Sequence, residues 1–454
     1  MATGQLRVLG VVIAATLVWA AQPPMAEAQL GGILIDADGV LRVRTFHDPG
    51  GRVLRARIAA AQAAFDQELS RTSPLRKVSI NRLEAALANS LANNRQPTEA
   101  MRHLAGLTHI QYVFYYPANK DIVLAGPAEG WVHDVSGRTI GMHSGQPILE
   151  LQDLIVALRA HAPERPDAPV VSVSIDPTQE GLAKMQDFLR SLRGIRPSDA
   201  PQIVRGLQTS LGLQDVSIRG VPANTHFAQV LVEADYRMKL IGIGLERPPV
   251  KLAIYVDKAD PASVSRNALQ RWYFVPDYEC VRISDDGTAM EMVGEGVKLL
   301  GEDEVVSADG TRRASGRVDR ASSMFTRSFT RMYPQLAAAS PIWAQLRNMI
   351  DISVAAAFIR SQGIYDQSGW DLGVFRDEEA YPVQIHTTPV RVESAVNSIW
   401  KRNTLMTPIG GGVRIEATRA LAEDNLLADE KGAVKAARAK IDPGTIDHDR
   451  WWWD

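Results

Sequence analysis

The chain has 454 residues, 45% of them apolar, so it can bury a sizeable core and form about two or three domains. Its formal net charge of −2 at pH 7 argues against bulk nucleic-acid binding, which requires a basic field. The single cysteine, Cys280, excludes an internal disulfide bond, so packing must stabilise the fold. Cys280 alternates with Tyr278 and Arg282 in a predicted strand, which favours a small buried side chain over a reactive thiol.

The N-terminus carries the pattern of a secretory signal peptide. Arg7 provides a positive flank, Val8 to Ala21 an apolar run, and Ala26-Glu27-Ala28 a cleavage site of the A-x-A type. The alternative, an uncleaved anchor, is disfavoured because the apolar run is short for roughly 30 Å of hydrocarbon. We expect residues 1–28 to be removed and the protein to be exported, either periplasmic or secreted. No later segment approaches the roughly 18 apolar residues of a membrane helix, so no transmembrane segment is expected after cleavage.

Residues 29–165 are predicted to form an N-terminal module with a hairpin, helices and a small antiparallel sheet. Ser79 and Thr98 are natural N-caps for two of the helices. A proline-rich segment at 162–169 marks the boundary to the next module. The predicted strands lie at 33–35, 40–46, 110–117 and 121–127, with a glycine-punctuated hairpin at 130–145, and the predicted helices lie at 52–70, 80–94, 97–107 and 148–161.

Residues 166–310 are predicted to form a central mixed α/β module. Asp176, followed by Pro177, is predicted to cap one helix, and Ser198 is predicted to cap the next. The succession of strand, two helices and strand indicates mixed pairing. The predicted strands lie at 170–176, 215–221, 252–257, 272–284, 289–294 and 296–301, and the predicted helices at 177–192, 198–212 and 225–246.

The last part of the chain is predicted to be helical and then polar. A helical module at 311–421 contains two antiparallel helices joined near Ser340-Pro341 and a late hairpin at 407–417. Residues 422–454 are predicted to be a charged helix, 422–440, and a flexible tail that ends in Trp451-Trp452-Trp453. The fold class that follows is α+β.

One short stretch, "ILIDADGVL", fits the nucleophile loop of haloacid-dehalogenase-type phosphatases. In that chemistry Asp36 would attack phosphorus and Asp38 would serve as general acid and base. The acidic, lysine and hydroxyl partners of such a site have no matching segment later in the chain. Asp38-Gly39 between two apolar strands is also a strong hairpin signal, because glycine tolerates the positive φ of a tight turn. The sequence therefore favours a turn.

The densest polar cluster, "VEADYRMK", lies on the predicted helix 225–246. Glu233 and Arg237 are four residues apart, as are Asp235 and Lys239, and each acid lies on the favourable N-terminal side. The main interpretation is an amphipathic helix that is stabilised by these pairs. The functional alternative is the charged wall of a cleft, with His226 near the helix start. The apolar stripe of this helix would consist of Phe227, Leu231, Ala234, Met238 and Ile241.

Several segments together resemble a family of exported proteins that carry a domain of unknown function and are best known from planctomycete bacteria. These segments are "GGILIDADGVL", "LRKVSINRLEAAL", "LAGLTHIQYVFYYPANKDIVLAGPAEGW", "SIDPTQEGL" and "GVPANTHFAQVLVEADYRMKLIGIGLE". The resemblance covers most of residues 30–365, and "ADYRMK" is its most distinctive wording. It implies export, but it implies neither a reaction nor any functional residue.

Two functions stay open. The first is a non-catalytic exported binding or scaffold protein, which the absence of a complete catalytic motif favours. The second is a hydrolase with an unfamiliar acid–base site, formed by Asp36 and Asp38 or by His226 with Glu233 and Asp235. Convergence of "LIDADG", "AGPAEGW" and "VEADYRMK" on one pocket would favour the enzyme.

The expected ligand is an unknown protein, peptide or small molecule. The candidate ligand-binding residues are Glu129, Trp131, Arg237 and Lys239. No cofactor is expected, and no metal site either, because the nine histidines are scattered along the sequence.

Overall fold

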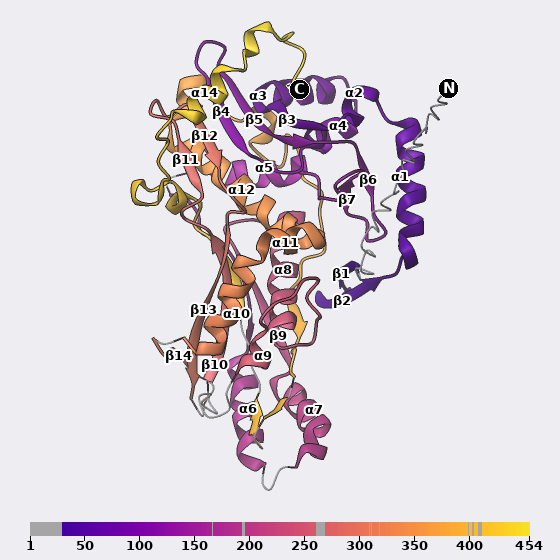
Figure 1. Cartoon of the computed structure of the whole chain (residues 1–454), viewed down its shortest axis with the longest axis vertical. Coiled ribbons are helices and arrows are strands. Elements are labelled where there is room, and N and C mark those ends of the chain that lie inside the picture. The colour runs from indigo at the N-terminus through magenta and orange to yellow at the C-terminus, as the bar shows by residue number, and fades with distance from the viewer. Residues whose placement is uncertain are drawn as a thin grey trace, which may run out of the picture.

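The computed structural model confirms the α+β class and shows two main β-sheets (Figure 1). It describes residues 30–165, 167–192, 196–259, 268–307, 309, 311–316, 318–397, 399–401, 404–406 and 411–454. The predicted signal peptide lies outside the described residues. None of the helices that the structure describes is long and apolar enough to span a membrane.

Nine of the described strands form a mixed sheet in the order β1-β2-β15-β9-β8-β18-β10-β13-β14. The pairs β2·β15 and β18·β10 are parallel and the other neighbours are antiparallel. In sheet order, the strands are β1 Leu30–Ile35, β2 Val40–Phe46, β15 Arg391–Glu393, β9 Leu213–Arg219, β8 Val171–Pro177, β18 Gly411–Ile415, β10 Ala268–Pro276, β13 Val297–Val306 and β14 Arg312–Ala314.

Six further described strands form an antiparallel sheet in the order β11-β12-β4-β5-β3-β19. They are β11 Val281–Ile283, β12 Ala289–Met292, β4 Tyr112–Tyr116, β5 Asp121–Ala128, β3 Ser73–Ser79 and β19 Trp452–Trp453. Two small hairpins complete the described strands: β6 Trp131–His133 with β7 Thr139–Gly141, and β16 Ile399–Lys401 with β17 Thr404–Met406. Both main sheets therefore draw strands from both sides of the predicted module boundaries.

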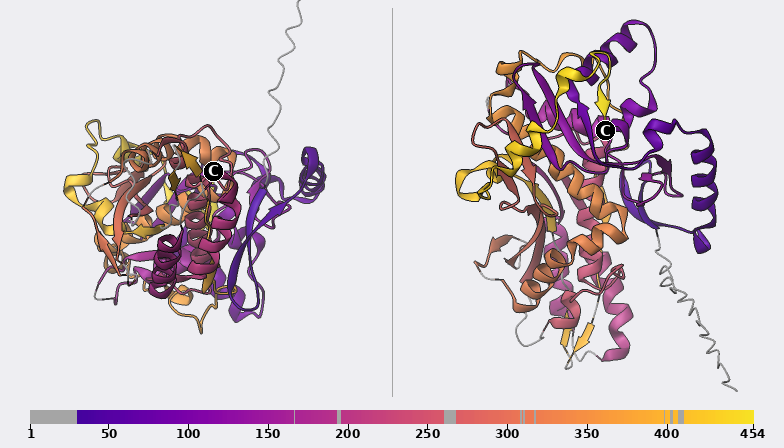
Figure 2. Two further views of the ribbon diagram at one scale, coloured as in Figure 1. Left: turned by 90° about the horizontal axis from the view of Figure 1, so that it is seen from below. Right: turned by 45° about the horizontal axis from the view of Figure 1, so that its top comes forward.

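The helices pack around these sheets, and α1 lies at the edge of the molecule in every view (Figures 1 and 2). Their bounds are α1 Arg52–Ala64, α2 Gln67–Ser70, α3 Ile80–Ala92, α4 Glu99–Arg102, α5 Leu151–Ala160, α6 Gln179–Ser191, α7 Ala200–Leu211, α8 His226–Gly242, α9 Tyr255–Lys258, α10 Arg320–Arg331, α11 Tyr333–Ala339, α12 Pro341–Ser361, α13 Ile364–Ser368 and α14 Ala433–Ala439.

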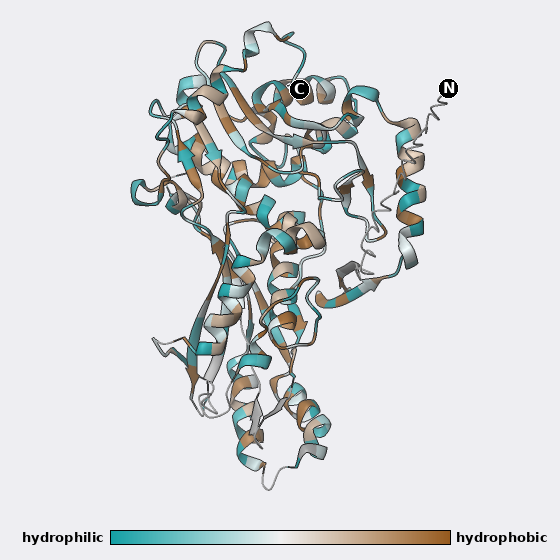
Figure 3. Cartoon of the chain, viewed as in Figure 1, coloured by the Kyte–Doolittle hydropathy of each residue, from teal (hydrophilic) through white to brown (hydrophobic). Residues whose placement is uncertain are grey.

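Helix α12 lies in the centre of the molecule and contacts α5, α8 and α11. Every residue from Ile342 to Ile359 is buried. A helix that is buried on all sides belongs to the core of a large domain, and its polar residues must find internal partners. Hydrophobic residues also line the strands β4 and β5, whereas α1 carries polar patches (Figure 3).

Local capping signals predicted several elements correctly. The Ser79 hydroxyl accepts a hydrogen bond from Arg82 N–H at the start of α3, and the Thr98 hydroxyl accepts one from Met101 N–H at the start of α4. The hairpin β1–β2 and the buried position of Cys280 are also confirmed. Burial raises the pKa of the Cys280 thiol to about 12, so the thiol is not activated.

Two predicted long helices are broken in the structure. The helix expected at 52–70 ends at Ala64, because Phe65 is extended (ψ 148°) and Asp66 caps the separate helix α2. The first helix of the expected antiparallel pair is split into α10 and α11 at Met332, where Pro334 follows at the start of α11. Proline cannot donate the backbone hydrogen bond that would continue the helix.

Two predicted helix caps were wrong by one or two residues. Strand β8 continues through Pro177, so Thr178 rather than Asp176 caps α6, and its hydroxyl accepts from Gly181 N–H (2.9 Å). The carboxylate of Asp176 instead accepts a hydrogen bond from Arg312 (2.7 Å). Ser198 lies within a 3-10 turn, and Asp199 occupies the N-cap position of α7.

The strand predicted at 252–257 was also wrong, because Tyr255–Lys258 is the helical turn α9. Tyr255 and Val256 are both buried. The backbone N–H of Ala259 donates to the carbonyl oxygen of Tyr255 (2.9 Å), which closes a helical turn at this point.

The C-terminal region differs most from its prediction. The charged helix expected at 422–440 is reduced to α14, and the tail is ordered: β19 pairs with β3 and places Trp452 opposite Val78 (Figure 2). The described part of the expected late hairpin, β18, is an inner strand between β8 and β10, whereas residues 407–410 lie outside the described residues. Distant strands pair in each case, and such pairing leaves no local sequence pattern.

Asp351 in α12 gives the first testable prediction, which concerns the pH dependence of stability. It lies near Arg347, which is ion-paired with Glu295 (3.0 Å). Burial raises the pKa of Asp351 to about 8, although Arg347 opposes the shift. The unfolded value is about 3.9, so between these values the folded state holds a proton that the unfolded state releases. Stability should therefore fall as pH rises, by up to about 1.4 kcal/mol per pH unit from this group.

The variant Asp351→Asn, which mimics the protonated acid, should remove this contribution. Urea unfolding at about pH 5, about pH 6 and about pH 7 should show a smaller loss of stability in the variant than in the wild type. If stability depended on pH equally in the two proteins, folding would not raise the pKa of Asp351.

Candidate functional site

A cavity of about 810 Å³ lies where β1, hairpin β6–β7, helices α4, α5 and α8 and residues 381–386 meet. Its volume falls in the range of small-ligand sites, roughly 300–1,000 Å³. Four of the nine histidines line it, although they are far apart in the sequence. The charged and imidazole side chains at its walls are Glu99, Arg102, His103, His133, Arg138, Glu150, His226, Glu233 and His386.

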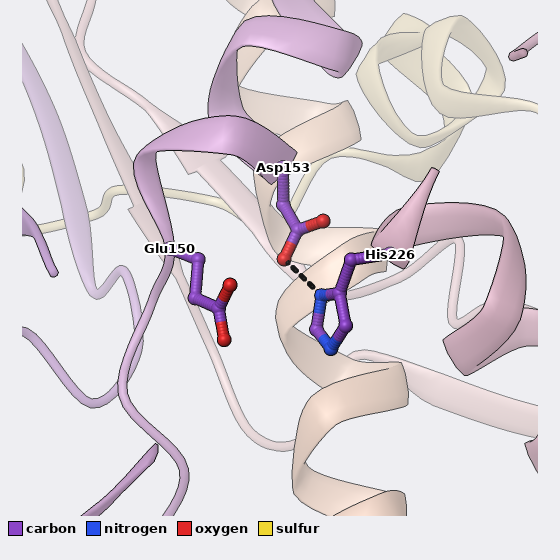
Figure 4. Close-up of side chains that lie close together, drawn as sticks. All are labelled: Glu150, Asp153 and His226. Carbon is purple, nitrogen blue, oxygen red and sulfur yellow. Dashed lines mark hydrogen bonds and ion pairs between the residues drawn. The ribbon is translucent and has the colours of Figure 1, made fainter. Parts of the chain in front are cut away.

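Three side chains converge at one wall of this cavity (Figure 4). Glu150 and Asp153 come from the start of α5, and His226 is the first residue of α8. His226 Nδ1 lies 2.8 Å from Asp153 Oδ2, and one ligand atom from each of the three residues lies within 4.8 Å of the others. Asp153 is buried, whereas Glu150 and His226 are partly buried and reach the cavity. Carboxylate oxygens and imidazole nitrogens can hold either a proton or a metal ion at this point.

The charges around His226 are set by its carboxylate neighbours. Burial by itself lowers the pKa of His226, but the carboxylates of Asp153 and Glu150 outweigh burial and raise the pKa to about 9. Burial lowers the pKa of His103 and of His386. At neutral pH the site therefore combines an imidazolium with neutral imidazoles, which offer both hydrogen-bond donors and acceptors.

Backbone contacts hold these side chains in place. The Thr225 hydroxyl accepts from Ala228 N–H (3.3 Å) and so starts α8 at His226. His386 N–H donates to the carbonyl oxygen of Asn224 (2.8 Å), which brings the two imidazole rings to a centroid distance of 5.8 Å. Residues from α8 and from a segment about 160 positions further along the chain thus share one wall.

The side of α8 that faces the cavity carries a second charged group. Glu233 accepts from Arg138 Nη2 (2.5 Å) and lies 3.5 Å from Arg237 Nη1. Arg138 Nε donates to Gln345 of α12 (2.9 Å). Arg237 Nη2 forms an ion pair with Glu246 Oε1 (2.7 Å), and Arg237 does not line the cavity. Of the charged and imidazole residues that were candidates on this helix, His226 and Glu233 line the cavity.

Asp235 and Lys239 face the nine-stranded sheet. Lys239 Nζ donates to Asp235 Oδ2 (3.1 Å) and to the carbonyl oxygen of Ile175 in β8 (2.9 Å). Both are buried, so the predicted i,i+4 pair is confirmed but the expected solvated helix face is wrong. The physical reason is that β8 and β18 cover one side of α8 while α5 and α12 cover another. Burial raises the pKa of Asp235 to about 6 and lowers the pKa of Lys239.

Glu129 and Trp131 support the site from outside the cavity. The Glu129 carboxylate accepts from the backbone N–H groups of His143 (2.6 Å) and Ser144 (3.1 Å), which fixes the loop after β7. Trp131 packs its ring against Phe65 (4.6 Å) and against His103 (5.3 Å), centroid to centroid. Both residues therefore make structural contacts, and the Trp131 ring packs against His103, which lines the cavity.

Asp36 and Asp38 form the turn of hairpin β1–β2. Asp36 Oδ1 accepts from Asp38 N–H (3.0 Å) and from Val40 N–H (2.9 Å), and Gly39 has φ +74°. This geometry is the tight turn that the sequence favoured. Strand β1 contributes Gly32 and Ile33 to the cavity, whereas neither aspartate lines it. Of the three segments whose convergence would have favoured an enzyme, only "VEADYRMK" reaches the cavity, through Glu233.

Sequence reasoning named His226 and Glu233 but missed Glu150, Asp153 and His386. Glu150 and Asp153 are three residues apart and fall in the cap and first turn of a helix, where acidic residues commonly stabilise the helix dipole. No spacing in the sequence relates them to His226 or to His386. The cluster arises from packing of the starts of α5 and α8 against residues 381–386.

Fold and site together define an α+β protein with a cavity lined by histidines and carboxylates. A family model described as "Protein of unknown function (DUF1598)" matches residues 173–255, a segment that runs from β8 to the start of α9 and includes His226. No activity is assigned to that family. No curated protein and no solved structure matches the chain. The family resemblance is confirmed for this segment, and its wider extent and the implied export stay predictions.

Proposed function

We propose that the chain is a binding protein whose cavity holds a small polar ligand. The observation that carries this proposal is the convergence of His103, His226, His386 and Glu150 on one cavity of about 810 Å³. Concave sites with a few convergent polar groups and shifted pKa values are the usual place of ligand binding. The signal-peptide pattern supports an exported, periplasmic or secreted location for this binding protein.

The charges of the cavity favour a ligand that can donate hydrogen bonds. Arg138 is already paired with Glu233 (2.5 Å), and Arg102 with Glu99 (3.1 Å), so these ions satisfy one another. Burial by itself would raise the pKa of Glu150, but the His226 imidazolium and other neighbours outweigh burial and lower it, so Glu150 offers an ionised acceptor at that wall. An amine, an amino acid or a short peptide fits this balance better than an anion.

A thermal-shift screen tests the proposal. The protein in EDTA is screened against amines, amino acids, dipeptides, sugars, nucleotides and chromogenic esters and phosphates. At about 100 times its dissociation constant a true ligand should stabilise the fold by about 2.7 kcal/mol. The variant Ile33→Trp, which places an indole at the cavity wall, should abolish the shift.

Leu34→Trp is the matched control, because Leu34 is the next residue of β1 and its side chain is exposed. A shift that survives Ile33→Trp would place the ligand elsewhere, and a library without any stabilising compound would count against the proposal.

A second candidate function is hydrolysis by acid–base catalysis, which the pairing of His226 with Asp153 favours. A carboxylate that accepts from one imidazole nitrogen orients the ring, and the other nitrogen can then move a proton. Ser136 and Thr139 line the cavity, but their hydroxyls contact Asp134 (2.6 Å) and His133 (3.2 Å), so water is the better nucleophile. Turnover of a chromogenic substrate in the same screen, lost in His226→Gln, would select this candidate.

A further inference from the structure

The cluster at the cavity wall has the donor set of a transition-metal site. It provides one oxygen from Glu150, one oxygen from Asp153 and one nitrogen from His226 within 4.8 Å of one another. The Asp153 and His226 atoms are already 2.8 Å apart. Around a zinc ion, with bonds of about 2.0–2.2 Å, neighbouring ligand atoms lie roughly 3 Å apart. Glu150 comes from the cap position of α5 and reaches the cavity, so rotation of its side chain can bring its carboxylate closer to the other two donors.

His386 lies beside this cluster and comes from an independent part of the chain. Its ring centroid lies 5.8 Å from that of His226, and its backbone is held by Asn224 (2.8 Å). Among the described residues, its Nε2 atom is buried and has no hydrogen-bond partner. A buried imidazole nitrogen without a partner costs free energy unless something binds it. A ligand bound to an ion at the cluster would provide that partner.

We propose that Glu150, Asp153 and His226 bind one divalent transition-metal ion, with Zn²⁺ as the expected occupant. This proposal rests on the proposed ligand-binding function, because the ion would lie at the wall of the same cavity. Imidazole nitrogen suits zinc and its neighbours in the transition series, whereas Mg²⁺ and Ca²⁺ prefer oxygen alone. Three protein ligands leave the fourth position of a tetrahedral zinc ion open, so an organic ligand in the cavity can take that position.

Metal titration tests this site directly. The protein is stripped with EDTA, and Zn²⁺ or Co²⁺ is then added while heat of binding and Co²⁺ visible absorption are followed. We expect one ion per chain. Zn²⁺ should abolish the Co²⁺ absorption bands, whereas Mg²⁺ and Ca²⁺ should leave these bands unchanged. Glu150→Gln and His226→Gln should each weaken Zn²⁺ binding by about tenfold or more.

His143→Gln is the matched control for the histidine variant, because His143 is exposed and its side chain lies outside the cluster. It should bind Zn²⁺ as the wild type does. Circular dichroism shows whether each variant is folded. Glu150→Gln should fold as the wild type does, because it replaces a partly buried side chain by one of the same shape. Unchanged affinity in either cluster variant, or no saturable binding at micromolar Zn²⁺, would overturn the metal site.

The two proposals fail in different ways. Ile33→Trp alters the cavity wall at β1 and leaves the three proposed metal-binding residues in place, so it should retain Zn²⁺ and lose the organic ligand. An organic ligand that binds in EDTA, combined with no Zn²⁺ binding, would refute the metal site alone. Zn²⁺ binding by the wild type with no organic ligand would refute the ligand proposal and support the metal site.

Discussion

Replacement of Asp235 by leucine is expected to lower the free energy of unfolding by about 3–5 kcal/mol. The change leaves Lys239 Nζ buried beside the carbonyl oxygen of Ile175 (2.9 Å) without its carboxylate partner (3.1 Å). Without the carboxylate, no ion pair offsets the free-energy cost of desolvating the buried ammonium group. Urea unfolding monitored by circular dichroism measures the loss.

The double variant Asp235→Leu/Lys239→Met separates the ion pair from packing. Because it removes both charges, most of the lost stability should return, since apolar replacements of a buried pair are often neutral or stabilising. Glu180 and Lys184 in α6 provide the matched control, with the same i,i+4 spacing but exposed side chains (77% and 61%). Replacing that pair should have no measurable effect. If the double variant were as unstable as Asp235→Leu, the altered side-chain shape, and not the unpaired charge of Lys239, would account for the loss of stability.

Replacement of Arg76 by leucine is the second change with a large expected effect, again about 3–5 kcal/mol. Arg76 is fully buried, and its guanidinium donates to both carboxylate oxygens of Asp454 (2.8 and 3.1 Å) and to the carbonyl oxygens of Ala105 (2.7 Å) and Arg71 (3.0 Å). It also lies over the Trp452 ring at 4.8 Å. The substitution would leave the buried carbonyl oxygen of Ala105 without its donor and the partly exposed carboxylate of Asp454 without its counter-charge.

Arg450→Leu is the control for Arg76→Leu. Arg450 also lies over Trp452 (5.2 Å) and pairs with Glu68 (2.9 Å), but its side chain is largely exposed. Thermal unfolding should therefore show a much smaller shift for Arg450→Leu than for Arg76→Leu. Similar shifts in the two variants would mean that burial of the guanidinium does not determine its contribution.

The sequence predicted those parts of the fold that local chemistry encodes. Ser79 and Thr98 identified helix starts because a side-chain oxygen must satisfy a free backbone N–H there. Asp38-Gly39 identified the β1–β2 turn because of the positive φ of Gly39. Strand partners were not predictable in this way: β18 lies between β8 and β10, and β19 beside β3, with hundreds of residues between some partners.

The candidate site was predictable only in part for the same reason. The spacing of Asp235 and Lys239 predicted their ion pair, but an i,i+4 pair looks identical in sequence on a solvated helix and in a core. His226 was named from its place at a helix start. Glu150, Asp153 and His386 meet it through tertiary packing, and no sequence pattern describes that packing.

The ordered C-terminal strand also bears on the tendency of the protein to aggregate. An exposed sheet edge can template pairing with a strand of another molecule. Among the described strands, three of the four edges of the main sheets are short: β11 and β14 have three residues each and β19 has two. By pairing with Lys77 and Val78, β19 covers part of the edge of β3, which has seven residues. The tryptophans at this end thus shorten the edge of the six-stranded sheet that is open to edge-to-edge association.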